Sequence, residues 1–310
     1  MKLHHAARAA RLMRASLLVC CLILPVAPGF AASLQVVATF SILADIARQV
    51  GGEGVVVHSL VGADEDAHGY QPRPSDARLV READLFVANG LGFDSWAERL
   101  AAAAGHARPL VIASDGVSAL ESSHDHSHGH GHDHGDLDPH AWQNVANAKV
   151  YASNIAAALI AADPEGADGY RQRLADYHLV LDALDAEIRS TLSVLPPSAR
   201  KIVTSHDAFA YFGRAYGMRF LAAAGLSQEA EPSAAGIARL VRQIRREEVA
   251  VVFLENVSDP RLLQRIANES GARVGGSLYS DALSGPNGPA PTYVEMMRHN
   301  LAIMMTGLRR

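Results

Sequence analysis

The sequence predicts an α/β fold of two lobes, each a parallel sheet with flanking helices, joined by one long rigid helix. Short apolar runs alternate along the chain with stretches in which apolar residues recur at helical spacing. That order is typical of parallel strands and their crossover helices. A long, uninterrupted helical pattern over 165–194 separates the first set of runs from the second. The chain is therefore expected to form lobes over 33–162 and 198–310, with a connecting helix within 163–197.

Each lobe is expected to contain four strands. The runs that predict them are 34–39, 55–60, 85–88 and 110–113 in the first lobe, and 201–204, 219–221, 250–254 and 273–275 in the second. Three helices between them have recognisable starts. One covers 75–83 after Pro74, another covers 233–247 with Ser233 as its cap, and the third covers 259–270 and begins Asp-Pro.

The connecting helix is predicted from seven residues at three- and four-residue steps, and it ends before Pro196-Pro197. A helix of this length would extend about 45 Å at 1.5 Å per residue. That exceeds an ordinary crossover helix and suits a rod between two lobes. The seven residues are Leu174, Tyr177, His178, Leu181, Leu184, Ile188 and Leu192.

Residues 1–32 are predicted to be a secretory signal peptide. Basic residues without any acidic one precede an apolar stretch over 15–27, and the small residues Gly29, Ala31 and Ala32 follow it. The apolar stretch is short for a membrane span, so cleavage after Ala31 or Ala32 is expected, with an uncleaved anchor as the alternative. A lipoprotein signal is not favoured, because Cys20 and Cys21 lie inside the apolar stretch and not at its end. The protein is thus expected in the periplasm.

The processed chain would contain no cysteine, since Cys20 and Cys21 are the only two. Disulfides, thiolate zinc sites and cysteine nucleophiles are then excluded. The full chain has 28 Lys and Arg against 33 Asp and Glu, a net charge of -5. Loss of the four basic residues within 1–32 leaves 24 against 33, a net charge of -9. Such a chain is a poor partner for nucleic acid or an anionic membrane and is compatible with a cationic ligand.

A histidine-rich loop is predicted over 121–135. Imidazole is a common ligand of zinc, copper and nickel, and the interleaved Gly, Ser and Asp cannot build a core. The run indicates auxiliary, weak metal sites; a low-complexity insertion that binds metal by accident is the alternative. Its six histidines are His124, His126, His128, His130, His132 and His134.

Four residues outside the run are candidate ligands of one specific site: His68, His140, His206 and Asp281. Three of them follow predicted strands, and His140 precedes a helix just after the histidine run. Ligands in open α/β sheets bind beyond the carboxyl ends of strands. Two candidates come from each lobe, which favours a cleft between the lobes, although each could instead be an ordinary loop residue. The remaining histidines after residue 32 lack a metal-like neighbourhood and are expected to be structural; these are His58, His106, His178 and His299.

Several motifs carry a resemblance to a known family. They are Ala67-His68-Gly69-Tyr70-Gln71-Pro72, Asp138-Pro139-His140-Ala141-Trp142, Ser205-His206-Asp207-Ala208-Phe209-Ala210-Tyr211-Phe212, Glu255-Asn256 and Tyr279-Ser280-Asp281-Ala282-Leu283. With them, the chain resembles the periplasmic solute-binding proteins of zinc and manganese ABC importers, the zinc-uptake and TroA-like family. The resemblance covers nearly all of the chain after residue 32. It implies two Rossmann-like lobes on a rigid helical backbone, with one metal at the lobe interface.

The resemblance implies that His68, His140, His206 and Asp281 are the ligands. Manganese members of the family carry Glu where His206 stands. Three imidazoles and one carboxylate suit tetrahedral zinc, whereas manganese prefers an oxygen-rich set. Zinc is therefore expected, although copper and nickel would also bind such a set in vitro. In several relatives water or a loop Glu replaces the Asp ligand, so that alternative stays open for Asp281.

The expected function is high-affinity capture of Zn²⁺, as the transported ligand, and its delivery to an ABC permease and its ATPase. A periplasmic zinc chaperone is a further expected partner, and the protein is expected to be a monomer and not an enzyme. The alternatives are a manganese-binding member of the family, a zinc buffer or adhesin, and an exported zinc hydrolase. The hydrolase would need an open coordination position and a general base, for which Glu255 or Asp207 would serve.

Overall fold

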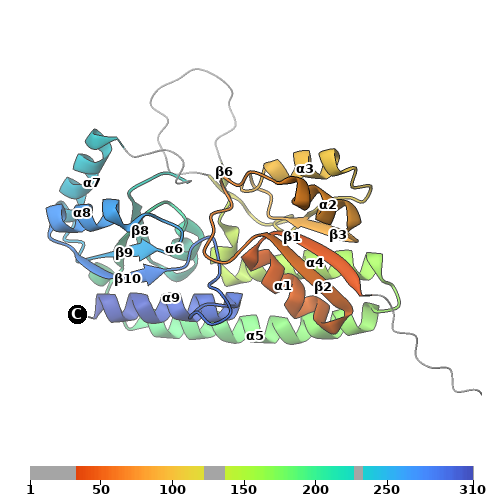
Figure 1. Cartoon of the computed structure of the whole chain (residues 1–310). Coiled ribbons are helices and arrows are strands. Elements are labelled where there is room, and N and C mark those ends of the chain that lie inside the picture. The colour runs from red at the N-terminus through yellow and green to blue at the C-terminus, as the bar shows by residue number, and fades with distance from the viewer. Residues whose placement is uncertain (1–32, 122–136, 227–232, 310) are drawn as a thin grey trace, which may run out of the picture. The chain divides into compact units, whose positions relative to one another are not determined.

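The computed structural model describes residues 33–121, 137–226 and 233–309 and confirms the predicted α/β class. Two separate four-stranded sheets lie side by side (Figure 1). The first has the order β2-β1-β3-β4, from β1 (Leu34–Phe40), β2 (Val55–Val61), β3 (Leu85–Ala88) and β4 (Val111–Ile112). The second has the order β10-β9-β7-β8, from β7 (Lys201–Thr204), β8 (Arg219–Ala222), β9 (Val251–Glu255) and β10 (Arg273–Leu278).

All strand pairs in these two sheets are parallel, as the alternating pattern predicted. Parallel strands buried on both faces read as continuous apolar runs, and all four residues of β3 are buried. A small antiparallel pair, β5 (Leu120–Glu121) with β6 (Leu137–Asp138), was not predicted from the sequence. These two strands flank the histidine run. The run itself and the predicted signal peptide lie outside the described residues.

The predicted helix starts are present. α2 (Pro74–Glu82) begins at its proline, and the Ser233 side chain caps α7 (Ala234–Arg246) by accepting from Gly236 N at 3.1 Å. Asp259 caps α8 (Pro260–Ser270) by accepting from Arg261 N at 3.0 Å. The other helices beside the sheets are α1 (Ser41–Gly51), α3 (Trp96–Ala104) and α6 (Ala210–Tyr216).

A long helix, α5 (Ala167–Ser193), runs beneath both sheets with α9 (Tyr293–Leu308) beside it (Figure 1). Its buried stripe contains the predicted Tyr177, Leu181, Leu184, Ile188 and Leu192. α4 (Val145–Ala162) packs on α5 and α1. It is apolar and long enough to cross a membrane by composition alone, but Tyr151, Ile155 and Leu159 are fully buried, so packing in the core accounts for much of its apolar character.

One large buried cluster contains residues of both sheets together with α1, α4, α5, α6 and α9. A smaller cluster lies between the other face of the second sheet and α7 and α8. Because the large cluster is shared, the loops at the carboxyl ends of both sets of strands are held against one another.

Candidate metal centre

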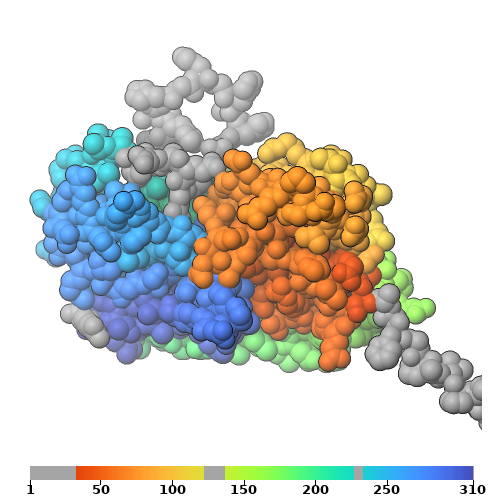
Figure 2. Space-filling view, in the orientation of Figure 1, coloured from red at the N-terminus to blue at the C-terminus, as the bar shows by residue number. Residues whose placement is uncertain are grey.

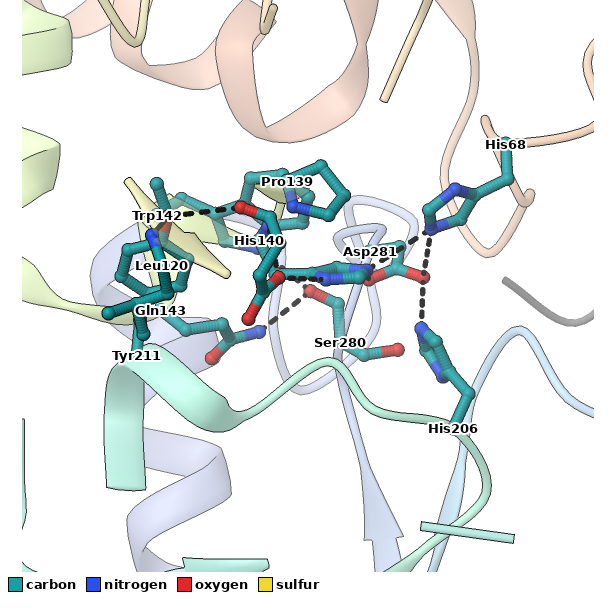
Figure 3. A network of polar contacts seen from close by, with 12 residues as sticks. His68, Leu120, Pro139, His140, Trp142, Gln143, His206, Tyr211, Ser280 and Asp281 are labelled. Carbon is teal, nitrogen blue, oxygen red and sulfur yellow. Dashed lines mark hydrogen bonds and ion pairs between the residues drawn. The ribbon is translucent and has the colours of Figure 1, made fainter. Parts of the chain in front are cut away.

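Four side chains converge between the two sheets: His68, His140, His206 and Asp281 (Figure 3). Their ligand atoms all lie within 4.8 Å of one another. His68 follows β2, His206 follows β7 and Asp281 follows β10, so these three lie beyond the carboxyl ends of parallel strands. His140 lies between β6 and a short 3-10 helix, η2 (Ala141–Gln143). The structure thus brings together all four residues that the sequence singled out.

The distances within the group are short. His68 Nε2 lies 3.1 Å from His140 Nε2 and 3.7 Å from Asp281 Oδ2. His206 Nε2 lies 2.9 Å from Asp281 Oδ2, and His140 Nε2 lies 3.6 Å from Asp281 Oδ1. Three of the side chains have no exposed surface, and that of His68 is 8% exposed. Such packing of three imidazoles around a buried carboxylate forms a closed set of donors for a cation.

Asp138 orients His140. Its Oδ1 accepts from His140 N at 2.9 Å and lies 2.7 Å from His140 Nδ1. The turn is fixed further by Asn89 Nδ2, which donates to Pro139 O at 3.0 Å, and by the Tyr211 hydroxyl, which donates to Asp138 O at 3.0 Å. Since Nδ1 faces Asp138, Nε2 is left to face the centre of the site.

Glu255, at the end of β9, orients His206 in the same way. Its Oε1 accepts from Ser205 N at 2.7 Å and from His206 N at 3.0 Å, and its Oε2 lies 2.6 Å from His206 Nδ1. A carboxylate behind a histidine fixes the ring tautomer and raises its basicity as a ligand. This role of Asp138 and Glu255 was not predicted from the sequence. The available signals were an Asp two residues before His140 and an acid at the carboxyl end of a buried strand.

Asp281 belongs to a loop that the first half of the chain holds in place. Ser280 O accepts from Trp142 Nε1 at 3.0 Å and from Gln143 Nε2 at 2.9 Å (Figure 3). Two residues beyond Asp281, Leu283 N donates to Ser41 Oγ at 3.0 Å. Both Asp281 oxygens are buried, and apart from the imidazole nitrogens neither has a polar partner among the described residues.

His68 is the ligand candidate nearest to solvent. Its backbone N donates to Asp66 Oδ1 at 2.9 Å, and its ring lies 4.4 Å from the Phe93 ring. A polar cavity of about 410 Å³ opens beside it, with Tyr70, Gln71 and Arg99 among its lining residues. The site therefore meets the surface on the His68 side.

Burial and charge set the protonation of the group. Burial lowers the pKa of His68 to about 3, in spite of the Asp281 carboxylate, so this imidazole is neutral. Burial would also lower the pKa of His206, but the Glu255 and Asp281 carboxylates outweigh it and raise this pKa well above its ordinary value. Burial would raise the pKa of Asp281, but the imidazoles, His206 foremost, hold it below its ordinary range. The site is thus built around a carboxylate that attracts positive charge.

The family follows from comparison with known proteins. A family model described as "Zinc-uptake complex component A periplasmic" matches residues 36–307. The chain belongs to this family. It is 33% identical over 275 residues to the manganese-binding lipoprotein MntA of Halalkalibacterium halodurans, covering 89% of this chain and 88% of that protein.

Two further relatives show comparable similarity to this chain. The manganese ABC transporter substrate-binding lipoprotein PsaA of Streptococcus pneumoniae is 33% identical over 285 residues, covering 89% of each chain. The solved periplasmic zinc binding protein TroA of Treponema pallidum superposes with a TM-score of 0.81 at 27% identity, covering 90% of this chain and 100% of that one. The predicted fold class, two α/β lobes with the candidate ligands between them, is thereby confirmed.

Members of this zinc-uptake family are extracytoplasmic metal-binding components of ABC importers, which act with a permease and an ATPase. They are not enzymes, so the hydrolase hypothesis is wrong. In the structure Glu255, the general base that this hypothesis would need, contacts the backbone of Ser205 and the backbone and ring of His206. These relatives do not support the prediction that the protein lacks a lipid anchor, because two of them are lipoproteins by name.

The remaining described histidines have other surroundings. His58 is exposed on β2, and His178 Nε2 lies 3.1 Å from Lys149 O. His299 Nε2 lies 3.2 Å from Ser277 O, and His106 packs edge-on against the Phe86 ring. Within the described part of the chain, only the four convergent residues form a group able to hold a metal ion.

Proposed function

We propose that this protein captures Zn²⁺ outside the cytoplasm at His68, His140, His206 and Asp281 and delivers it to the permease of an ABC importer. The convergence of three imidazoles and one carboxylate, buried between the lobes, is the observation that carries the proposal. Nitrogen-rich sets of this kind suit zinc, and on nitrogen ligands zinc binds more tightly than manganese.

The size of the donor set supports zinc. Zinc bonds of 2.0–2.1 Å to imidazole and carboxylate place tetrahedral donors about 3.3–3.4 Å apart. The four close contacts between donor atoms, 2.9, 3.1, 3.6 and 3.7 Å, bracket that value. Separations within the donor set reach 4.8 Å, so a tetrahedron around zinc would require some donors to move inward by more than an ångström.

The number of donors favours binding and transport of the metal over catalysis. Four protein ligands around tetrahedral zinc leave no position for a reactive water, which is the pattern of non-catalytic sites. The carboxylates of Asp138 and Glu255 fix two of the imidazoles before metal arrives. A pre-organised closed site of this kind favours tight, selective binding.

Manganese is the second candidate. Two relatives are manganese proteins by name, and both Asp281 oxygens face imidazole nitrogens. A carboxylate that binds through both oxygens would raise the coordination number and provide the harder oxygen donors that manganese prefers. We propose zinc and not manganese because position 206 is a histidine and not a carboxylate, so the four side chains supply three imidazoles and only one carboxylate.

Competition between the two metals tests the choice. Metal-free protein with 121–135 present or deleted is titrated with Zn²⁺ and with Mn²⁺ against a chelator of known affinity. The proposal expects tight 1:1 zinc binding that survives the deletion, is lost in His140→Ala, and persists in His178→Ala, a control histidine outside the site. Tighter binding of manganese than of zinc would establish the second candidate. Loss of tight binding on deletion of 121–135 would contradict the assigned site.

The histidines at 124–134 are proposed as weak auxiliary sites that raise the local concentration of zinc. Their deletion should slow capture from dilute zinc and leave the affinity of the main site unchanged. We further propose a monomer, processed after Ala31 or Ala32 and free of lipid, that can receive zinc from a periplasmic chaperone. Mass spectrometry of the exported protein tests the processing, because a lipid on Cys20 or Cys21 would contradict it.

A further inference from the structure

A stripe of three arginines runs along the outer face of α7: Arg239, Arg242 and Arg246, all exposed. Residues at i, i+3 and i+7 of a helix share one face. The opposite face of α7 carries the buried Leu240, Val241 and Ile244. The stripe therefore points away from the core, into solvent.

The stripe differs from the neighbouring arginines because those form ion pairs or hydrogen bonds. On the adjacent α8, Arg261 pairs with Asp259 and Arg265 pairs with Glu269. Arg245 of α7 donates to Glu269 O. Arg239, Arg242 and Arg246 form no side-chain ion pair or hydrogen bond with any described residue. Glu229 and Glu231 lie outside the described residues. These three guanidinium groups, unpaired within the described part of the chain, form a concentrated positive surface on one face.

The charge of the chain is divided unevenly between its halves. Residues 33–162 contain 7 Lys and Arg against 16 Asp and Glu, and residues 163–197 contain 3 against 7. Residues 198–310 contain 14 against 10. The first lobe and the long helix are thus strongly acidic, whereas the second lobe is basic, and the α7 stripe is a concentrated part of that basic charge.

The stripe also has a defined place in the fold. α7 lies at the outer end of the second sheet, on the side away from α5 and α9 (Figure 1), and its atoms form part of the surface there (Figure 2). α5 and α9 lie along the opposite side of the molecule (Figure 1). A partner that approaches the second lobe from the side away from the long helix meets the stripe directly.

We propose that Arg239, Arg242 and Arg246 form a docking surface for a cluster of acidic side chains on the extracytoplasmic face of the importer's permease. Arginine is suited to this because its guanidinium binds carboxylates through two parallel hydrogen bonds. The proposal rests on the importer role of the protein and not on the choice between zinc and manganese.

The charge distribution favours a protein partner over anionic lipid. A membrane rich in anionic lipid presents negative charge over its whole area, so it would repel the acidic first lobe while it attracted α7. A permease can place its acidic residues beneath α7 alone. Localised complementary charge of this kind steers encounter and fixes the orientation of the docked partner.

Charge reversal tests the surface. The double variant R239E/R242E is compared with R78E/R81E, which makes the same change at the same helical spacing on α2 of the first lobe. Each full-length variant replaces the chromosomal copy, and initial uptake of radioactive zinc is measured at low ionic strength. Zinc affinity of the purified proteins is measured in parallel and is expected to be unchanged in both, since neither pair lies in the metal site.

The proposal expects R239E/R242E to lower uptake about tenfold, as when two interface contacts change from attraction to repulsion, with R78E/R81E near wild type. Equal uptake in all three proteins, or an equal loss in both variants, would overturn it. Stripe-dependent binding of the purified protein to vesicles of equal parts phosphatidylglycerol and phosphatidylcholine would assign the stripe to lipid, and stripe-dependent self-association in ultracentrifugation would assign it to a second copy. If the wild type imports manganese and not zinc, the zinc proposal fails, and the same comparison is made with radioactive manganese.

Discussion

Replacement of Glu255 by Gln tests whether the carboxylate behind His206 sets the affinity of the metal site. In the structure Glu255 Oε1 accepts from two backbone N–H groups and Oε2 lies 2.6 Å from His206 Nδ1. A glutamine keeps the first acceptor but turns an N–H toward Nδ1. A neutral His206 ring can accept that donor at Nδ1 only if its single proton lies on Nε2, the atom that should bind metal. The substitution therefore preserves shape and favours the wrong tautomer.

The expected loss is ten- to hundredfold in zinc affinity, the usual effect of removing such a partner, or about 1.4–2.7 kcal/mol. It is measured by competition with a zinc chelator, with thermal unfolding of the metal-free protein as the check on folding. Glu187→Gln, which removes the same charge from the exposed surface of α5, is the matched control and should bind like wild type. Zinc binding by Glu255→Gln within twofold of wild type, in a protein of normal stability, would refute the positioning role.

Three further predictions concern the same site. Zinc affinity should fall about tenfold for each unit by which the pH is lowered from 8 to 6, because the raised pKa of His206 means that zinc must displace one proton from this ring. His68, with a pKa of about 3, is already neutral in this range. Calorimetry in buffers of different ionisation enthalpy counts the displaced proton, and a count of zero would contradict the assignment. His206→Glu should reduce the preference for zinc over manganese, since it replaces an imidazole by a harder oxygen donor; an unchanged ratio of the two affinities would show that His206 does not set selectivity. Ser41→Ala should weaken zinc binding about fivefold, since a buried N–H of the Asp281 loop loses its acceptor at a cost of about 1 kcal/mol; titration at fixed pH checks this, and wild-type affinity would mean that the loop is held without Ser41.

The sequence was sufficient for most of the fold because the pattern of burial was simple. Strands such as β3, buried along their whole length, appear as continuous apolar runs, and α5 shows its buried stripe at helical spacing. The pair β5 and β6 was missed because each strand is one leucine followed by one acidic residue, which leaves no apolar run, whereas the equally short β4 is wholly apolar. Four candidate ligands were found because three of them follow strands, beyond whose carboxyl ends such sheets bind ligands, and because the motifs around all four resemble those of a known family.

The support around the ligands could not be predicted because it depends on contacts between distant parts of the chain. Ser41 holds the backbone of Leu283, and Trp142 holds that of Ser280. No local pattern relates these positions. Glu255 was recognisable as an acid at a strand end, but its role is set by the 2.6 Å contact with His206 Nδ1, which requires the folded backbone.

The coordination shell of bound zinc tests the central claim most directly. X-ray absorption at the zinc edge is measured on protein that lacks 121–135 and carries one equivalent of zinc. The account predicts three imidazole nitrogens and one carboxylate oxygen at about 2.0–2.1 Å, with one imidazole lost in His206→Ala. A shell dominated by water oxygens, or one unchanged in His206→Ala, would contradict it.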